Sequence, residues 1–410
     1  MVPEKDATRN TVQKSCCVMC REPCFGWMLS SFRPAVELYF EQRDFTRRDV
    51  LVAALAGLSA NVEECVRCIR AHRQLSPAGL VRRFGRKLLI LYKLLLLEQR
   101  VVLYSPSCQD VSKDVIALAS LVPGLIYSLS PSYQALRATE ANEGRRHLTL
   151  DTSGGNGLSH HHLLSAHGLP LHVFHRKSRL DPYIPLELMM TGDRRHGGML
   201  AGSSNSLLTS SPPKGLVHVL ANCETGSLVV HSTEMKAAGH LSAHERTFMD
   251  EVTAKVEASD NGGDDDDEND SMTPSHPRWE GSGKWVRAKF EEYTMRMLQA
   301  AARKSQLGLI SGDVVNKEIM ENEMPRLYGQ AWIDVWLQSR NYSRWAAEHD
   351  LSIAHISRAP KSPAVIGSIK DGFQSSVVDF RNVGLVPAAK ARCKILLLMA
   401  CTCNTNIELL

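Results

Sequence analysis

The sequence has few aromatic residues, no hydrophobic run long enough to span a bilayer, and little excess of charge. Aromatic side chains make up 6% of its 410 residues, and the formal net charge is +4. Single-stranded nucleic acid is bound by basic grooves with aromatic stacking platforms, so this composition does not favour a nucleic-acid partner. The apolar run 88–97 contains Lys93 and is far shorter than the ~20 residues of a transmembrane helix. We therefore expect no nucleic-acid partner and no transmembrane segment.

Motifs for nucleotide binding and covalent catalysis are also missing. There is no G-x-x-x-x-G-K-[ST] loop, and the glycine-rich stretch 154–157 lacks both the lysine and a flanking strand. No G-x-S-x-G turn supplies a nucleophile to go with the His-Gly-Gly run at 196–198. The histidines in 147–175 lack an H-E-x-x-H pattern, and the acidic run 264–267 lacks the spacing of a calcium loop. We therefore expect no enzyme, no catalytic residue and no bound cofactor.

The cysteines leave one metal site open as an alternative. The sequence contains two cysteine pairs with CxxC spacing, Cys17/Cys20 and Cys65/Cys68. This spacing suits a tetrahedral zinc site. The gap between the pairs is longer than a usual zinc-ribbon loop. Cys65 and Cys68 also fall on one face of an amphipathic pattern, so a helix without metal is the favoured interpretation. No apolar signal sequence follows Met1, which predicts a cytosolic chain with reduced thiols.

The clearest structural pattern lies between Ser76 and Leu121. Ser76-Pro77 marks a helix start, because the hydroxyl caps a free N–H and proline is tolerated in the first turn. Apolar residues then recur every three or four positions, namely at Leu80, Phe84, Leu88, Leu91 and Leu95. This spacing predicts a helix that is buried over most of its circumference. Val101–Tyr104 has the composition of a strand buried on both faces, and a second amphipathic helix begins near Asp110.

The start of this helix has a basic edge. The segment 76–100 contains one acidic residue, Glu98. Its cationic residues are Arg82, Arg83, Arg86, Lys87, Lys93 and Arg100. Anionic lipid head groups or an acidic partner could use such a patch. Pairing of the arginines with nearby acids is the alternative, and the pattern favours it.

Further along the chain, beyond the segment 76–121, the period of the hydrophobic pattern changes to two. The strand candidates are Leu169–Phe174, Met199–Gly202, Leu216–Ala221 and Ser227–His231, the last two forming a hairpin. Ser242 and Glu245 match the capping box of a helix start. Amphipathic helices are expected at 279–302 and from Pro325 onward, and three tryptophans after Pro325 predict an aromatic core.

Several of these segments resemble a known family in the same order. The central one reads RRFGRKLLILYKLLLLEQRVVLYSPSCQDVSKDVIALASLVPG. The others read LPLHVFHRKSRLDPYIPL, GGMLAGSSNSLL, WEGSGKWVRAKFEEYTMRMLQAA and AWIDVWLQSRNYSRWAAEHD. Together they resemble the Avl-nine late secretory pathway family of DENN-domain proteins. The resemblance covers roughly residues 35–381, with the acidic insert unmatched.

The resemblance implies an α/β fold with the tripartite DENN architecture, in which a longin-like module, a central α/β module and a helical module follow one another. The first part of the longin-like module has no counterpart among the motifs. The expected divisions are 1–32, an irregular or atypical start; 33–75, a remnant of the longin-like module; 76–257, the central α/β module with a polar loop at 137–167; 258–278, an acidic disordered linker; 279–382, the helical module; and 383–410, a divergent tail.

The resemblance also implies a function. Relatives with this architecture act in Golgi-to-surface vesicle transport, and DENN modules bind Rab-type small GTPases and promote GDP release. We therefore expect a cytoplasmic protein that is recruited peripherally to Golgi, endosomal or plasma membranes and acts on a Rab-type GTPase as exchange factor or effector. Exchange works through preferential binding of the nucleotide-free state, so it needs no catalytic side chain. A trafficking adaptor without exchange activity is the alternative, and no contact residue is predicted for either.

Overall fold

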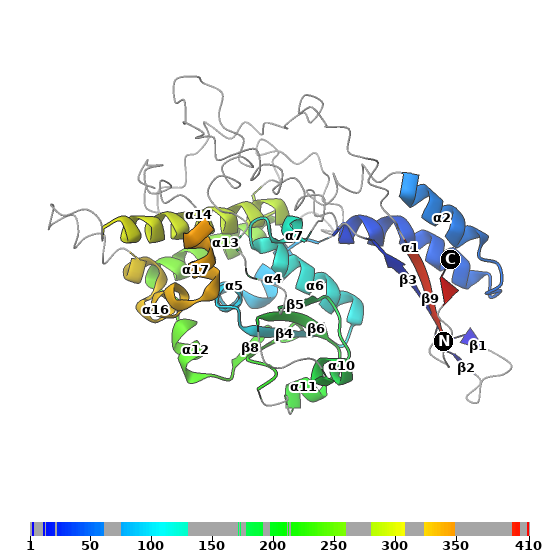
Figure 1. Ribbon diagram of the computed structural model, residues 1–410, viewed down its shortest axis with the longest axis horizontal. Helices are drawn as coiled ribbons and strands as arrows, with labels where there is room; N and C mark the ends of the chain where they lie inside the picture. Colours follow the sequence, from blue (N-terminus) through cyan, green and yellow to red (C-terminus); the bar gives the residue numbers. More distant parts are fainter. Residues whose placement is uncertain are drawn as a thin grey trace, which may run out of the picture. The chain divides into compact units, whose positions relative to one another are not determined.

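The computed structural model of the chain describes residues 2–3, 11–12, 14–20, 23–60, 75–129, 171, 173, 178–191, 197–210, 212, 215–259, 280–307, 324–348, 396–401 and 408–409. The chain divides into two compact units (Figure 1). The first is built from Met1–Gln74, Ile126–Thr152 and Val378–Leu410, and the second from Leu75–Leu125 and Ser153–Val377. Each unit is described separately below.

The first unit combines helices with short antiparallel strands. Its elements are β1 (Val2–Pro3), β2 (Thr11–Val12), β3 (Lys14–Met19), α1 (Phe25–Glu41), α2 (Asp49–Ala60), β9 (Leu396–Cys401) and β10 (Glu408–Leu409). β9 lies between β10 and β3, and it pairs with β3 from Lys14 opposite Cys401 to Met19 opposite Leu396. The tail, for which the sequence pattern gave no structural account, thus contributes strands to this unit.

Helix α1 corrects the expectation of an irregular start. It begins at Phe25, inside the segment 1–32, and buries Trp27, Phe32 and Tyr39 along its length. These aromatic residues are five and seven positions apart, and Pro34 lies within the helix. A search for apolar residues every three or four positions misses such a helix, because its buried aromatic residues are further apart than that and the internal proline argues against a helix.

The second unit is built around a five-stranded mixed sheet. Its strands are β4 (Arg100–Tyr104), β5 (Arg179–Asp181), β6 (Met199–Ser203), β7 (Val219–Asn222) and β8 (Ser227–Val230), in the order β5-β6-β4-β7-β8. β4 is central and parallel to both neighbours, and Val101, Val102 and Leu103 are fully buried, as predicted. β7 and β8 form the predicted antiparallel hairpin. The described chain is therefore a mixed α/β protein, which confirms the predicted fold class.

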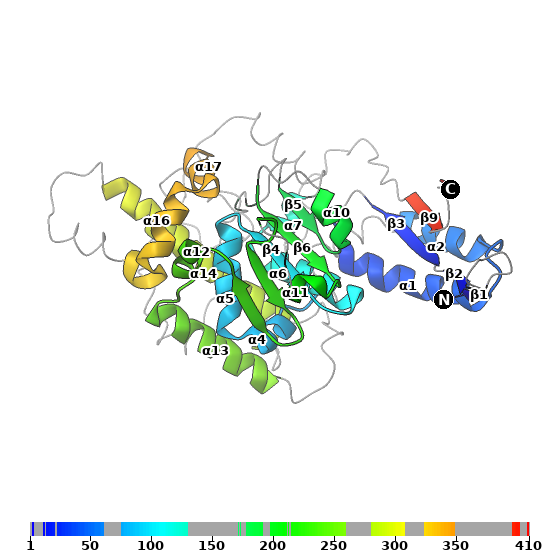
Figure 2. The same cartoon turned by 90° about the horizontal axis from the view of Figure 1, so that it is seen from below.

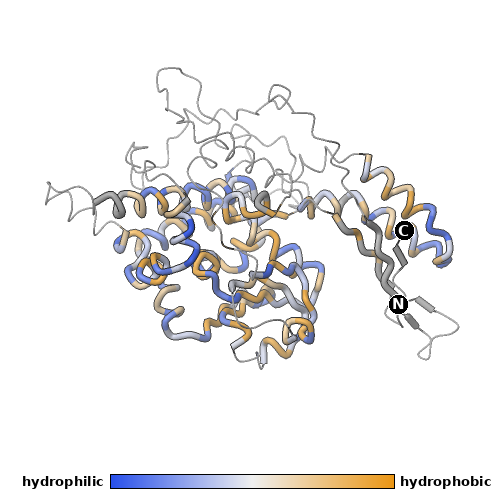
Figure 3. The backbone as a smooth tube through the Cα atoms, viewed as in Figure 1, coloured by the Kyte–Doolittle hydropathy of each residue, from blue (hydrophilic) through white to orange (hydrophobic). Residues whose placement is uncertain are grey.

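The other described helices are α4 (Ala78–Phe84), α5 (Arg86–Leu96), α6 (Cys108–Leu121), α7 (Leu125–Ser128), α10 (Leu186–Thr191), α11 (Leu207–Ser210), α12 (Thr233–Ala238), α13 (Ala243–Ser259), α14 (Gly283–Leu307), α16 (Gln330–Gln338) and α17 (Arg340–Glu348). Figure 2 shows α4 and α5 between the sheet and α13. A further helical turn covers 324–328. Figure 3 shows the alternation of apolar and polar residues along these helices. None of the described helices is long and apolar enough to cross a membrane.

The predicted long helix is divided at Gly85. This residue has φ 50° and ψ −127°, and it separates α4 from α5. The turn of the β7–β8 hairpin explains the break, because Gly226 packs directly on the carbonyl of Arg83 and its own carbonyl accepts a hydrogen bond from Lys87 Nζ at 2.9 Å. The sequence pattern could not show this, since the hairpin lies far from the helix along the chain.

The helices beyond the sheet agree closely with the sequence pattern. The capping box is confirmed: Ser242 N–H donates to Glu245 Oε2 at 2.8 Å, and Glu245 N–H donates to Ser242 Oγ at 3.1 Å. α14 confirms the amphipathic helix expected at 279–302, because apolar residues three or four positions apart are buried along it, namely Val286, Phe290, Tyr293, Met297 and Ala301. The helix expected from Pro325 is interrupted at Gly329, which has φ 80° and precedes α16.

Candidate functional site

The parallel strands β5, β6, β4 and β7 end at one edge of the sheet, where α/β proteins usually bind their ligands. Backbone hydrogen bonds tie the loops of this edge together. Ile184 N–H donates to Gly202 O at 2.8 Å, and Cys223 N–H donates to Tyr104 O at 2.8 Å. The two motifs P-Y and G-S-S-N therefore meet here, with Tyr183 Oη and Ser204 Oγ 3.2 Å apart.

Polar side chains at this edge mostly hold the turns in place. Asn205 Oδ1 accepts a hydrogen bond from Leu207 N–H at 3.0 Å, and Asn222 Oδ1 accepts one from Glu224 N–H at 2.9 Å. Ser107 Oγ caps α6 by accepting from Asp110 N–H at 3.2 Å. Ser203 is fully buried, and its Oγ has no hydrogen-bond partner. Among these side chains no hydroxyl is paired with a base, so the edge is better suited to binding than to covalent chemistry.

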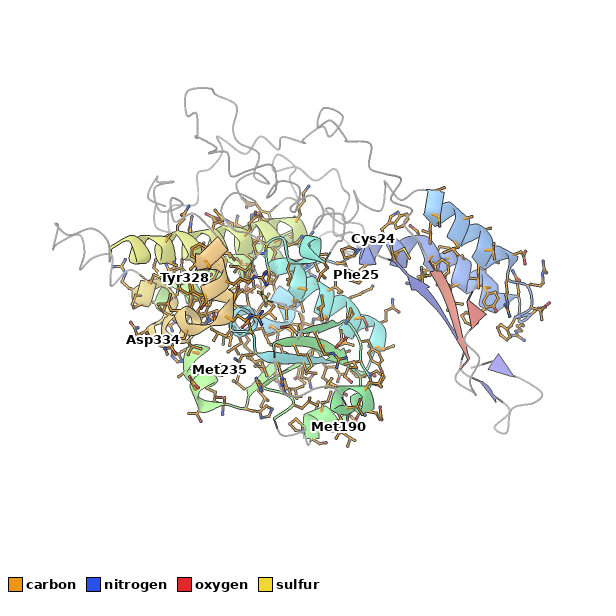
Figure 4. All side chains as sticks on the ribbon, viewed as in Figure 1. Cys24, Phe25, Met190, Met235, Tyr328 and Asp334 are labelled. Atoms are coloured by element: carbon orange, nitrogen blue, oxygen red, sulfur yellow. The ribbon has the colours of Figure 1, made fainter. Side chains whose placement is uncertain are left out.

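Large apolar side chains are exposed beside this edge. They are Tyr183, Leu188, Met190 and Leu207, with 42%, 59%, 45% and 57% of their surface exposed. We call this group the α10–α11 surface; Figure 4 labels Met190 on it. Both helices cover the same face of the sheet, because Leu186, Met189 and Leu208 share one buried cluster with strand residues. Exposed apolar side chains gathered in this way are typical of protein contact sites.

Three residues of the basic edge of α4 and α5, namely Arg83, Arg86 and Lys87, are paired within the protein. Arg83 forms an ion pair with the largely buried Asp114. Arg86 donates two hydrogen bonds to Asp250, at 2.6 and 2.5 Å. Lys87 bonds to a carbonyl, as noted above, and Arg100 Nη1 donates to Gly215 O at 2.9 Å. The interpretation of the edge as internally paired is thus favoured over a patch for acidic partners or lipids.

Lys93 is the residue whose importance the sequence pattern concealed. It is fully buried, and its Nζ lies 2.8 Å from Glu245 Oε1. The same nitrogen donates to Tyr328 O at 2.9 Å, and Glu245 Oε1 also accepts from Tyr293 Oη at 2.7 Å. In addition, Trp332 Nε1 donates to Lys93 O at 3.2 Å. The sequence signal that could have indicated this pair is a lysine inside an apolar run, together with a capping-box glutamate later in the chain.

The electrostatics of this centre follow from its burial. Burial lowers the pKa of Lys93 because it disfavours the ammonium ion, and the charge of Glu245 acts in the opposite direction. Burial and the neighbouring carboxylate raise the pKa of Tyr293 well above its usual value, so the phenol stays protonated. The groups are therefore satisfied by one another, and the centre has the character of a structural junction.

A second buried cluster joins Asp114 to the end of β7. Burial raises the pKa of Asp114, while Arg83 lowers it in part. Burial and the nearby Asp114 carboxylate also raise the pKa of the Cys223 thiol. Because the thiolate is the nucleophilic form, Cys223 is not suited to catalysis.

Several predicted features lie outside the described residues. They are Cys65 and Cys68, the polar loop 137–167 with its glycines and histidines, His196, and the acidic linker from 260. The zinc alternative therefore stays a prediction for that pair. Among the described residues no group of three or more potential ligands could hold a metal ion.

The comparisons with known proteins decide the family. The family described as Transport protein Avl9 matches residues 1–301 of the chain.

The chain belongs to the Avl9 family.

This match contains the segment 76–121, the P-Y and G-S-S-N motifs and the whole of the segment WEGSGKWVRAKFEEYTMRMLQAA. It also contains residues 1–34, for which the motifs gave no resemblance. The Avl9 assignment confirms the resemblance drawn from the sequence.

Individual relatives agree with the family. The chain is similar to late secretory pathway protein AVL9 of Saccharomyces cerevisiae, with 24% identity over 355 residues. This region is 83% of the chain and 44% of the yeast protein. It is also 24% identical over 355 residues to late secretory pathway protein avl9 of Schizosaccharomyces pombe, which is 84% of the chain and 70% of that protein. The chain thus spans less than half the length of the first of these relatives.

Proposed function

We propose that this chain acts in vesicle transport of the late secretory pathway, as a DENN-type regulator that binds a Rab-type small GTPase. The observation that carries the proposal is its membership of the Avl9 family, together with its similarity to two proteins named for the late secretory pathway. Peripheral recruitment from the cytoplasm to late secretory or recycling membranes is part of the same proposal.

The chemistry of the described residues supports a binding role. The polar groups at the carboxyl edge of the sheet hold turns, and the buried ion pairs join helices. Exchange of a bound nucleotide needs no nucleophile, because it depends on tighter binding of the nucleotide-free GTPase than of the loaded form. We propose on this basis that the protein carries out no covalent catalysis.

A trafficking adaptor without exchange activity is the second candidate. One feature favours it: the exposed apolar side chains of the α10–α11 surface are suited to protein contact. An adaptor would bind its partners without discriminating between nucleotide states.

Release of fluorescent GDP from a panel of Rab proteins separates the two candidates. We expect the full chain to accelerate release from at least one Rab protein and to bind that protein most tightly when nucleotide is absent. The Schizosaccharomyces pombe relative, measured in parallel, controls for segments that the chain does not share. Acceleration by neither protein, with no preference for any nucleotide state, would replace the regulator with the adaptor.

A further inference from the structure

Two cysteine sulfurs meet in the first unit, where β3 leads into α1. Cys20 directly follows β3, and Cys24 directly precedes Phe25, the first residue of α1. Figure 4 labels Cys24 beside Phe25 at the start of this helix. The Sγ atoms of Cys20 and Cys24 lie 3.7 Å apart. The sequence pattern paired Cys20 with Cys17, whereas the structure places its sulfur against that of Cys24.

The two sulfurs differ in oxidation state. Cys24 is disulfide-bonded, which corrects the expectation of reduced thiols for this residue. Cys20 carries a thiol, as do Cys16, Cys108 and Cys223. The disulfide partner of Cys24, which we call the third cysteine, is therefore a cysteine whose side chain lies outside the described part of the chain. The remaining cysteines are Cys17, Cys65, Cys68, Cys393, Cys401 and Cys403.

The surroundings of the pair favour reaction between a thiolate and a disulfide. Cys20 is half-buried, whereas Cys24 is 2% exposed, so Cys20 is the nearest thiol that a solvent-protected disulfide meets. No acidic residue occupies the first turn of α1. The partial positive charge at a helix N-terminus stabilises anionic sulfur. A thiol in contact with a disulfide is the arrangement from which exchange begins.

A metal pair is the competing interpretation of the same distance. Two thiolates on a tetrahedral zinc ion, with Zn–S bonds of about 2.3 Å, lie about 3.8 Å apart. A sulfur in a disulfide does not supply the thiolate that zinc requires. The described residues also contain no group of three or more potential ligands. Exchange is therefore favoured over metal binding.

We propose that Cys20 and Cys24 form a thiol–disulfide exchange site at the junction of β3 and α1. The Cys20 thiolate attacks Cys24 Sγ, the bond between these two sulfurs forms, and the bond from Cys24 to the third cysteine breaks. The third cysteine leaves with the electron pair and takes up the proton that Cys20 has lost. No oxidant or reductant is consumed. The site changes which cysteine is held covalently at the start of α1, and it does not depend on the function proposed above.

Disulfide mapping of the full chain tests the proposal. The purified chain is oxidised with oxidised glutathione, freed of it, and incubated at about pH 8 with iodoacetamide and no reductant. A sulfur that leaves a disulfide is then alkylated and does not return. Trypsin cuts after Lys14 and Arg21, so a Cys20–Cys24 disulfide joins peptides 15–21 and 22–43, and fragment spectra locate the linked cysteine. We expect the joined peptides and the alkylated third cysteine to increase together.

Cys20→Ser removes the attacking sulfur. It should lower both products at least about 10-fold, because the incubation offers no other nucleophile in contact with the disulfide. Cys16→Ser is the matched control, since it removes a thiol from β3 four positions earlier and should behave like the unchanged chain. Unchanged circular dichroism spectra check that both variants fold.

Three results would overturn the proposal. The first, which needs only the unchanged chain, is a Cys24 that stays fully alkylatable after oxidation or is never joined to Cys20. The second is Cys20→Ser that releases the third cysteine as fast as Cys16→Ser. The third is one equivalent of zinc that the purified chain holds, Cys16→Ser keeps and Cys20→Ser loses, because the two sulfurs would then be metal ligands.

Discussion

At the residue scale, Lys93 has all three of its donors satisfied in the interior. Its partners come from α13, from the segment after α12 and from the turn 324–328, through Glu245, His240 O at 3.5 Å and Tyr328 O. Burying an ion pair costs desolvation, and this cost is offset only when the geometry is good and the remaining lone pairs are occupied. Glu245 meets the second condition, because it also accepts from Ser242 N–H and Tyr293 Oη.

Lys93→Met should therefore lower the free energy of unfolding by about 3–5 kcal/mol, since it leaves the Glu245 carboxylate buried without its cation. Lys93→Met combined with Glu245→Gln should recover much of this loss, because glutamine keeps the acceptor for the capping box and carries no charge. Urea unfolding of the single and double variants measures both values.

Lys255→Met is the matched control for this prediction. Lys255 pairs with Glu280 at 2.5 Å, but the two side chains are 53% and 59% exposed. Solvent-exposed pairs contribute about 0–1 kcal/mol, so this change should have little effect. If Lys93→Met cost no more than Lys255→Met, the buried pair could not be the junction described here.

At the element scale, two glycines with different backbone conformations separate the effects of strain and helix propensity. Gly85 has φ 50°, whereas Gly57 lies within α2, and an added Cβ would meet no atom within 4 Å at either position. Gly85→Ala should cost about 1–3 kcal/mol from backbone strain alone. Gly57→Ala should stabilise α2 by up to about 1 kcal/mol. The midpoint temperatures of thermal unfolding of the two variants should shift in opposite directions. An unchanged midpoint for Gly85→Ala would contradict the argument that the backbone at this position favours glycine.

Much of the element pattern was readable from the sequence, and the exceptions have physical causes. β4, the β7–β8 hairpin and the capping box at Ser242 depend on local spacing and were predicted correctly. The break at Gly85 depends on a hairpin more than a hundred positions later, and α1 is hidden by its proline. The α10–α11 surface was missed for a similar reason, because exposure on a short helix cannot be told from burial by composition alone.

At the scale of the second unit, distant segments are joined at α5. Trp332 Nε1 donates to Lys93 O, and Asn341 Nδ2 donates to Leu96 O at 3.1 Å. Trp332 also stacks on Trp336, with ring centroids 5.2 Å apart, and both are buried. The three-part division with a separate helical module at 279–382 stays a prediction. These contacts make it possible to test whether the helices after residue 279 unfold independently of α5.

We expect α5 and α16 to open together, because each supplies buried partners to the other. Under native conditions, hydrogen exchange followed by mass spectrometry should give peptides of the two helices the same free energy of opening. Trp332→Phe removes the donor to Lys93 O and part of the buried ring, and it should lower protection in both helices by a similar amount. Asp334→Ala, at an exposed position on the same helix, is the control and should leave both nearly unchanged. If Trp332→Phe released α16 while α5 kept its protection, the helices after residue 279 would form a module that opens by itself.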